Sequence, residues 1–204
     1  MIKIVPTITA FAPTDFTAAI AKLNFALRLH IDISDGEFAP SQTVNLNQIY
    51  WDKEKIVDLH LMMKRPAEWL HQIVALAPDL VILHAEAENL LPIFDHLRKF
   101  NIKCGVALLP ETMPEQASEI IKVADHVLIF GGHLGYQGGT ANLKQLEKAE
   151  QIRAINPTVE IGWDGGANLD NVAEIATNVD VINVGAAIQE AENPKEMFEK
   201  LAKA

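Results

Sequence analysis

The sequence predicts an α/β fold of about eight parallel β-strands, and three observations support this prediction. Short apolar runs rich in β-branched residues alternate with helix-period segments along the whole chain. The apolar runs recur roughly every 20–30 residues, as repeated βα units require. No linker, low-complexity tract or run of like charges divides the chain, so we expect one domain over residues 1–204.

The predicted strands are the apolar runs that Pro, Gly, Asn or Asp residues bound on each side. They lie near residues 2–9, 26–33, 55–62, 80–86, 103–109, 126–132, 159–164 and 181–188. Eight strands of this kind could form an open doubly wound sheet or a closed (β/α)8 barrel. The regular spacing and the complete coverage of the chain favour the barrel.

Helices are expected between the strands, because the intervening segments carry one apolar stripe each. In 14–24, 113–124 and 168–178 the apolar residues follow the i, i+3, i+4, i+7 pattern of an amphipathic helix. A last helix is expected to begin at Asn193-Pro194, a capping residue followed by proline at the first helical position. Segment 34–54 has only a weak helical pattern, and a connection of this length is often a functional loop.

Composition excludes several classes of protein. The chain has 204 residues, 49% hydrophobic and 22% charged, and its apolar runs are too short for a membrane span. Its start lacks the features of a signal peptide, so we expect a cytoplasmic protein. The single cysteine, Cys104, supports neither a disulfide framework nor a zinc finger. A net charge of −10 disfavours nucleic acid and membrane partners, although backbone N–H groups can still bind a phosphorylated small molecule.

Ionisable residues gather at the carboxyl ends of the predicted strands, where a (β/α)8 barrel places its active site. One strand ends with His30 and Asp32, the next with His60, and the seventh with Asp164, while the fourth ends with His84. A lone histidine there would more often be a core residue, but several buried ionisable groups must pair or bind a metal. We therefore expect His30, Asp32, His60 and Asp164 to bind one divalent metal, with Zn²⁺, Fe²⁺, Mn²⁺ and Co²⁺ all suitable.

Glycine-rich segments follow the last three predicted strands. Gly135 and Gly138 lie in the segment 131–139, Gly165-Gly166 follow the seventh strand, and Gly185-Ala186 follow the eighth. Neighbouring loops of this kind expose backbone N–H groups and predict a phosphate site. His133 lies in the first of these loops, where substrate contact and simple solvent exposure are equally compatible with the sequence.

These residues together resemble the ribulose-phosphate 3-epimerase family across the whole chain. The resemblance is carried by 5–8 (VPTI), 29–40 (LHIDISDGEFAP), 58–62 (DLHLM), 84–87 (HAEA), 105–108 (GVAL) and 164–166 (DGG). It implies a TIM barrel of the ribulose-phosphate-binding type and an isomerase that inverts C3 of D-ribulose 5-phosphate to give D-xylulose 5-phosphate, a reaction of the pentose phosphate pathway. It also suggests a homo-oligomer.

The resemblance also implies roles for individual residues. Asp32 and Asp164 would be the acid/base pair, one on each face of a metal-stabilised enediolate, and both would bind the metal together with His30 and His60. Removal of the C3 proton is chemically reasonable, because the neighbouring carbonyl acidifies it and a cation stabilises the resulting oxyanions. The implied substrate contacts are Thr7, His60, Met62, Gly135, Gly138, Gly165, Gly166, Gly185 and Ala186.

Departures from the family pattern leave alternatives open. Ser34 stands where the family usually has Met, Ala186 where it has Ser, and the segment 135–139 is only partly similar. A 3-epimerase of another ketose phosphate, such as a ketohexose 6-phosphate, is therefore a further hypothesis. A related decarboxylase or synthase is disfavoured because Ser34 occupies the position of its lysine. The third alternative is a degenerate, non-catalytic barrel, which the survival of all four metal ligands argues against.

Overall fold

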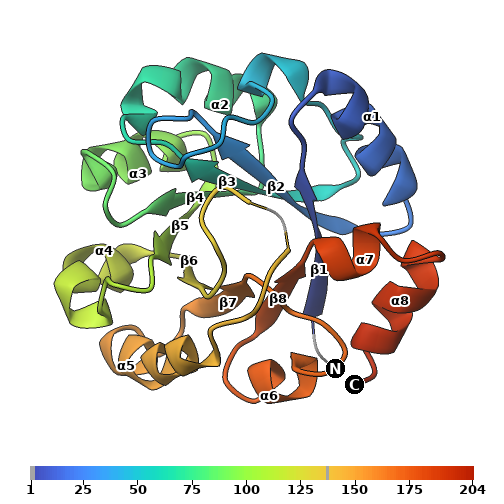
Figure 1. Ribbon diagram of the computed structural model, residues 1–204. Coiled ribbons are helices and arrows are strands. Elements are labelled where there is room, and N and C mark those ends of the chain that lie inside the picture. The colour runs from blue at the N-terminus through green and yellow to red at the C-terminus, as the bar shows by residue number, and fades with distance from the viewer. Residues whose placement is uncertain (1–2, 137) are drawn as a thin grey trace.

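A computed structural model describes residues 3–136 and 138–204 of the chain. Its eight strands are all parallel and close into a barrel in the order β1 to β8, with β8 paired to β1 (Figure 1). The closed (β/α)8 TIM barrel predicted from the sequence is thereby confirmed. Ile2, at the predicted start of the first strand, and Gln137, in the glycine-rich segment 131–139, lie outside the described residues.

The strands lie close to their predicted positions. They are β1 Lys3–Thr9, β2 Arg28–Ser34, β3 Ile56–Met62, β4 Leu80–His84, β5 Lys103–Leu108, β6 His126–Phe130, β7 Glu160–Asp164 and β8 Val181–Val184. The prediction of a strand over 181–188 was too long. Gly185 ends β8, and the backbone turns at once into a short helix that begins at Ala186.

α-Helices follow every strand except β2 and form an outer ring (Figure 1). The α-helices are α1 Pro13–Lys22, α2 Leu70–Leu76, α3 Leu90–Arg98, α4 Ser118–Val123, α5 Lys148–Ile155, α6 Val172–Ala176, α7 Ala186–Gln189 and α8 Pro194–Leu201. Short 3₁₀ helices are η1 Leu46–Gln48, η2 Pro66–Trp69, η3 Pro114–Ala117 and η4 Leu143–Glu147.

Two predicted helices differ from the structure in detail. The expected helix over 113–124 is divided into η3 and α4. The expected helix over 168–178 is reduced to α6, because asparagine side chains bind the backbone ahead of it. The Asn168 backbone N–H donates to Asn171 Oδ1, and the Asp170 backbone N–H donates to Asn168 Oδ1. These local bonds favour a turn over a first helical turn. The Asn193 side chain caps α8 as expected.

The apolar core lies mainly between the strands and the surrounding helices. Inside the barrel the apolar layer is small and consists of Leu80, Ile82, Ala107 and Leu128. The alternation of side chains along each strand explains this, since residues two apart share the interior face. The interior of the barrel is therefore apolar at its middle and polar at both ends.

The N-terminal end of the barrel interior holds a group of paired charges, which we call the N-terminal charge cluster: Arg28, Asp58, His126 and Glu160. Arg28 Nε donates to Asp58 Oδ2 at 2.8 Å, and its Nη1 and Nη2 donate to the two Glu160 oxygens at 3.2 and 2.8 Å. His126 Nδ1 lies 3.1 Å from Glu160 Oε2. These hydrogen bonds give both carboxylates a cationic partner at the end of the barrel remote from the predicted site, while Asp58 Oδ1 and His126 Nε2 have no hydrogen-bond partner among the described residues.

Residues 35–45, which we call the β2 loop, replace a helix after β2 and lie at the C-terminal end of the barrel. Asp35 orders the loop, because its Oδ1 accepts from the Glu37 and Phe38 N–H groups at 2.8 Å each. The Ser41 hydroxyl donates to the Gly135 carbonyl, which joins the β2 loop to the segment after β6. Two long connections therefore meet over the C-terminal end of the barrel. Among the described residues, no helix has both the length and the apolar character needed to cross a bilayer.

Candidate active site

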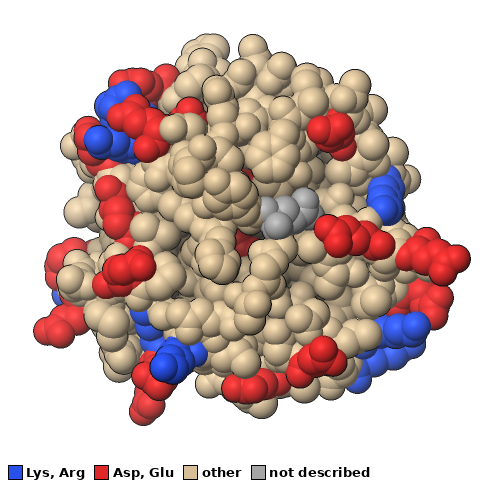
Figure 2. All heavy atoms as spheres, in the orientation of Figure 1, with Lys and Arg blue, Asp and Glu red and all other residues tan. Residues whose placement is uncertain are grey.

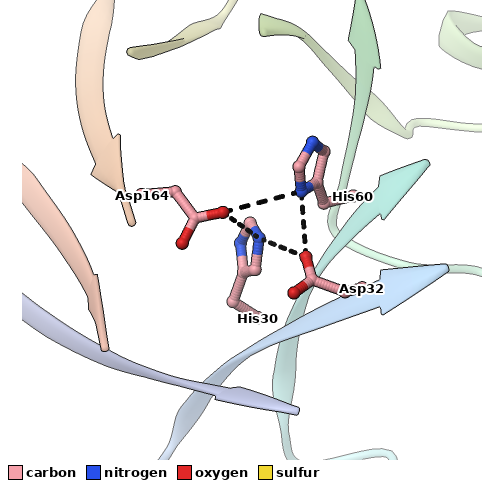
Figure 3. Close-up of side chains that lie close together, drawn as sticks. All are labelled: His30, Asp32, His60 and Asp164. Carbon is pink, nitrogen blue, oxygen red and sulfur yellow. Dashed lines mark hydrogen bonds and ion pairs between the residues drawn. The ribbon is translucent and has the colours of Figure 1, made fainter. Parts of the chain in front are cut away.

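Four ionisable side chains converge inside the C-terminal end of the barrel. His30 and Asp32 come from β2, His60 from β3 and Asp164 from the end of β7 (Figure 3). One potential ligand atom from each residue lies within 4.8 Å of those of the other three. We call these four residues the metal cluster. The strand pattern explains the convergence, since β2 and β3 are paired with Asp32 opposite His60, and Asp164 reaches the same point from the other wall.

The distances within the metal cluster centre on Asp32. Its Oδ1 lies 2.9 Å from His60 Nδ1 and 3.2 Å from His30 Nε2. Asp164 Oδ2 is farther away, at 3.8 Å from His60 Nδ1 and 4.0 Å from His30 Nε2. The second Asp32 oxygen accepts a hydrogen bond of 2.7 Å from the Thr9 hydroxyl, which fixes the orientation of the carboxylate. One ligand atom from each of the four residues therefore faces the same small volume.

The metal cluster fits a divalent cation on its own geometry and chemistry. Both histidines are fully buried, His30 Nε2 meets the Asp32 carboxylate at 3.2 Å, and His30 Nδ1 has no hydrogen-bond partner among the described residues. A buried polar atom without a partner is costly, and two imidazoles with two carboxylates form a common ligand set for Zn²⁺ and its neighbours. Neither Lys nor Arg is present among the described residues that line the adjoining pocket. A bound cation would therefore balance the negative charge of the Asp32 and Asp164 carboxylates.

The two carboxyl groups of the metal cluster differ in acidity. Burial disfavours the charged form of Asp32, but hydrogen bonds with His30 and His60 outweigh burial and lower its pKa. Burial, reinforced by repulsion from the Asp32 carboxylate, raises the pKa of Asp164 to about 6. The carboxyl groups are thus biased in opposite directions, with Asp32 ionised and Asp164 able to hold a proton near neutral pH.

A pocket of about 150 Å³ opens above the metal cluster. Asp32 and Asp164 line it, and it also contains most of the predicted substrate contacts. These are Thr7, Met62, Gly135, Gly138, Gly165, Gly166, Gly185 and Ala186. His60 was also predicted to contact substrate, but it does not line this pocket: it is fully buried within the metal cluster. Figure 2 shows that the Lys and Arg side chains of this face lie toward its rim and not around the central hollow.

The glycine segments around the pocket are packed backbone to backbone. Gly165 has a φ of +115°, and a Cβ atom there would lie 2.2 Å from Gly132 N. Gly166 has a φ of +67°, and a Cβ atom there would lie 2.4 Å from Ala141 N. Side chains at these positions would push the β6 and β7 connections apart. The close packing leaves the wall of the pocket lined with peptide groups instead of side chains.

Two polar residues of the pocket went unrecognised in the sequence. Thr9 lies two residues after Thr7, on the same side of β1, and orients Asp32. Asn183 is 2% exposed on β8, lines the pocket, and has no hydrogen-bond partner for either side-chain amide atom among the described residues. The available signal was strand alternation, because Asn183 is the one polar residue of β8 and lies two residues before Gly185.

The structure separates Ser34 from His133, the two residues whose roles the sequence left open. Ser34 does not line the pocket. Its hydroxyl donates to the Ser41 carbonyl at 2.6 Å, so it holds the β2 loop. His133 does line the pocket, and it also lines a larger neighbouring cavity of about 550 Å³ beneath the segment after β6. The polar change at position 34 therefore acts on the loop and not on the pocket wall.

Comparison with known proteins agrees with this geometry. The model of the ribulose-phosphate 3 epimerase family matches residues 3–189. The chain belongs to this family. A relative named ribulose-phosphate 3-epimerase from Encephalitozoon cuniculi is 31% identical over 168 residues, covering 81% of this chain and 76% of the relative. A relative of the same name from Helicobacter pylori is 26% identical over 208 residues, covering 98% and 96%.

A solved structure of a 3-hexulose-6-phosphate synthase has the same fold, with a TM-score of 0.75 over 99% of each chain at 18% identity. At this identity the likeness concerns the barrel alone. Membership in the epimerase family rests on the sequence match, and the family resemblance stated from the motifs is confirmed by it. The described residues that carry those motifs include all four members of the metal cluster.

Proposed function

We propose that this protein is a metal-dependent 3-epimerase that interconverts D-ribulose 5-phosphate and D-xylulose 5-phosphate. One observation carries the proposal: Asp32 and Asp164 reach the same buried cluster from opposite walls of the barrel, with their pKa values shifted in opposite directions (Figure 3). Inversion of a carbon centre requires a proton acceptor on one face and a proton donor on the other. The family match and the relatives' names support the same reaction.

Proton transfer would be the work of the two carboxyl groups. The Asp32 carboxylate takes the proton from C3 on one face of the sugar. The C3–H bonding electrons move into the C2–C3 bond and the carbonyl π electrons move onto the C2 oxygen, which gives a planar enediolate. The Asp164 carboxylic acid then delivers its proton to C3 on the opposite face, which inverts the centre. After this cycle Asp32 holds a proton and Asp164 is ionised, so the reverse reaction runs through the same pair with the roles exchanged.

His30, Asp32, His60 and Asp164 would hold the divalent cation, for which Zn²⁺, Fe²⁺, Mn²⁺ and Co²⁺ all suit the ligand set. The cation would supply a Lewis acid beside the carbonyl and hydroxyl oxygens of the substrate. The buried histidines exclude water from the inner side of the cluster, and Thr9 keeps the Asp32 carboxylate from rotating away from the reacting carbon. The protein thus preorganises the proton acceptor before substrate binds.

We propose that different parts of the pocket bind the sugar and the phosphate of the substrate. Thr7 Oγ1 and the Asn183 amide are buried in the pocket without hydrogen-bond partners in the part of the chain that the structure describes. They therefore suit sugar hydroxyls, which both donate and accept. The phosphate would lie against the peptide groups at Gly165, Gly166, Gly185 and Ala186. Met62 contributes an apolar surface to the same pocket. Backbone binding is consistent with the absence of Lys and Arg from the described lining.

The test is hydrogen exchange at C3 in D₂O. The protein, stripped of metal and reloaded with each of the four cations in turn, is incubated with D-ribulose 5-phosphate and followed by NMR. We expect deuterium at C3, formation of D-xylulose 5-phosphate, and loss of both after chelation. A parallel assay with ketohexose 6-phosphates separates the pentose from the hexose substrate. The proposal is wrong if no reloaded form incorporates deuterium into any of these ketose phosphates.

A further inference from the structure

The metal cluster continues outward through two buried histidines to Glu86, an exposed residue just after β4. His60 Nε2, on the far side of the ring from the cluster, lies 2.9 Å from His84 Nε2 on β4. His84 Nδ1 in turn lies 3.6 Å from Glu86 Oε2. Both imidazoles are 0% exposed. The order of contacts is therefore Asp32, His60, His84, Glu86, running from the metal cluster toward the surface.

The contact between the two histidines couples their tautomers. Two ring nitrogens at 2.9 Å must share one hydrogen, with one nitrogen as donor and the other as acceptor. If both rings are neutral, there are two arrangements. Either His84 donates from Nε2, and His60 carries its hydrogen on Nδ1, or His60 donates from Nε2, and His84 carries its hydrogen on Nδ1. Only the second leaves the His60 Nδ1 lone pair free on the side of Asp32 and the metal cluster.

Without a cation, the Asp32 carboxylate at 2.9 Å favours a hydrogen on His60 Nδ1, which is the first arrangement. Glu86 favours the second arrangement, since its carboxylate can likewise only accept. At 3.6 Å its charge favours a hydrogen on His84 Nδ1 and disfavours a lone pair there. The Thr112 hydroxyl donates to the other Glu86 oxygen and restrains the carboxylate.

Aromatic packing holds the His84 ring in this orientation. Phe38 of the β2 loop lies against it, with ring centroids 4.7 Å apart, and the Phe130 ring meets it edge-on at 6.2 Å. These contacts exclude water from the link between His60 and His84. The β2 loop, which the sequence indicated as functional, therefore contributes to the chain through Phe38.

We propose that His84 and Glu86 are positioning residues that keep the hydrogen of His60 on Nε2, so that Nδ1 presents its lone pair to the bound cation. This inference rests on the proposed metal site but not on the identity of the sugar. Groups that orient a metal-binding histidine in this way commonly change metal affinity when removed. Neither residue touches the pocket among its described lining, so their action is through His60.

Metal affinity provides the first test, measured without substrate by competition between the apoprotein and a chelator for Zn²⁺. We expect His84→Phe and Glu86→Ala to weaken binding by roughly 10–100-fold. His84→Gln should recover most of the affinity, because an amide oxygen can still accept from His60 Nε2. Glu88→Ala is the matched control, an exposed carboxylate on the same connection, and should leave the affinity unchanged. Circular dichroism and the melting temperature establish that each variant is folded.

Nitrogen-15 NMR of the Zn²⁺-loaded protein provides the second test, because it reports which ring nitrogen carries hydrogen. We expect hydrogen on His60 Nε2 and on His84 Nδ1 in the wild type, and a lost preference at His84 in Glu86→Ala. Hydrogen on His84 Nε2 in the wild type would overturn the proposal, as would wild-type affinity in both His84→Phe and Glu86→Ala. Failure to bind any of the four cations would overturn the metal site itself, whereas lack of turnover with intact binding would overturn only the proposed function.

Discussion

The two ends of the barrel interior use the same kinds of residue to opposite effect. At the N-terminal end, Arg28 supplies positive charge to Asp58 and Glu160 through three hydrogen bonds. At the C-terminal end, the ion-pair partners of Asp32 and Asp164 among the described residues are two histidines, His30 and His60. The carboxylates of the N-terminal charge cluster therefore have a permanent cation beside them, whereas those of the metal cluster have no Lys or Arg beside them within the described part of the chain. We infer that the first cluster serves stability and the second is suited to a cationic ligand.

The two clusters lie close together along β2 and β3. Arg28 and His30 lie two residues apart on β2, and Asp58 and His60 lie two residues apart on β3. Alternation places all four side chains in the interior, separated by one step of the strand. We infer that the residue types at these four positions decide whether an end of the barrel is closed by ion pairs or can hold a cation.

The largest expected effect is the loss of catalysis in Asp164→Asn. The amide cannot deliver a proton to C3, so we expect epimerisation to fall on the order of 10²–10⁴-fold. The unfolding free energy should stay the same or rise, because the substitution removes the repulsion between Asp32 and Asp164. Turnover of ribulose 5-phosphate in metal-loaded protein, with the metal content measured, checks this. A loss of less than tenfold would contradict the assigned role.

The opposite result is expected at the other end of the barrel for Arg28→Met. The methionine keeps the apolar stem but leaves Asp58 and Glu160 without their shared cation, so we expect the protein to lose about 3 kcal/mol of stability. Turnover at a temperature where the variant is folded should stay within a few-fold of wild type. Urea denaturation measures the first quantity and the epimerase assay the second.

Arg65→Met is the matched control for Arg28→Met. Arg65 also binds a carboxylate, Glu37, through two hydrogen bonds, at 2.6 and 2.7 Å, but both side chains are 43% exposed. An exposed pair of this kind contributes little to stability, so Arg65→Met should be much less destabilising than Arg28→Met. An equal loss of stability in both variants would show that burial does not distinguish the N-terminal charge cluster from a surface pair.

Metal loading is expected to have the next largest effect, and only through the metal cluster. A cation present at one hundred times its dissociation constant should stabilise the protein by about 2.7 kcal/mol. Chelation should remove this increment in the wild type. His30→Ala should lack it, whereas Arg28→Met should retain it. Urea denaturation of apo and Zn²⁺-loaded forms measures all three, and an equal increment in His30→Ala would place the cation elsewhere.

The fold and the convergence of His30, Asp32, His60 and Asp164 could be predicted because both depend on local patterns. Strand alternation marks the interior residues of each strand, and the carboxyl ends of parallel strands meet in one place. Strand alternation does not specify contacts that form only once the barrel has closed. Ser34 shares a side of β2 with Asp32, yet it binds Ser41 because the strand ends there and the β2 loop folds back. The approach of His84 to His60 likewise depends on side-chain angles that spacing does not specify.

The smallest expected effect is a pH dependence that belongs to the N-terminal charge cluster. Burial disfavours the Glu160 carboxylate, but hydrogen bonds from His126 and Arg28 outweigh burial and hold its pKa below the ordinary value of 4.5. A folded-state pKa below the unfolded value means that the contribution to stability is present above pH 4.5 and is lost as the pH falls below it. Glu160→Gln should therefore be less stable than wild type at pH 7, by about 1.5 kcal/mol for charge-assisted hydrogen bonds.

That difference between Glu160→Gln and wild type should shrink steadily as the pH is lowered from 5 toward 3, because protonation then removes the same charge from the wild type. Urea denaturation across this range measures it in the metal-free protein, so that the metal cluster does not contribute a metal-release step. Glu196→Gln, at an exposed pair with Lys200, serves as the control and should show little change. A difference that stays constant or grows on acidification would mean that Glu160 is not stabilised as a carboxylate. Ion pairing would then not be what closes the N-terminal end of the barrel, and the contrast with the C-terminal end would be wrong.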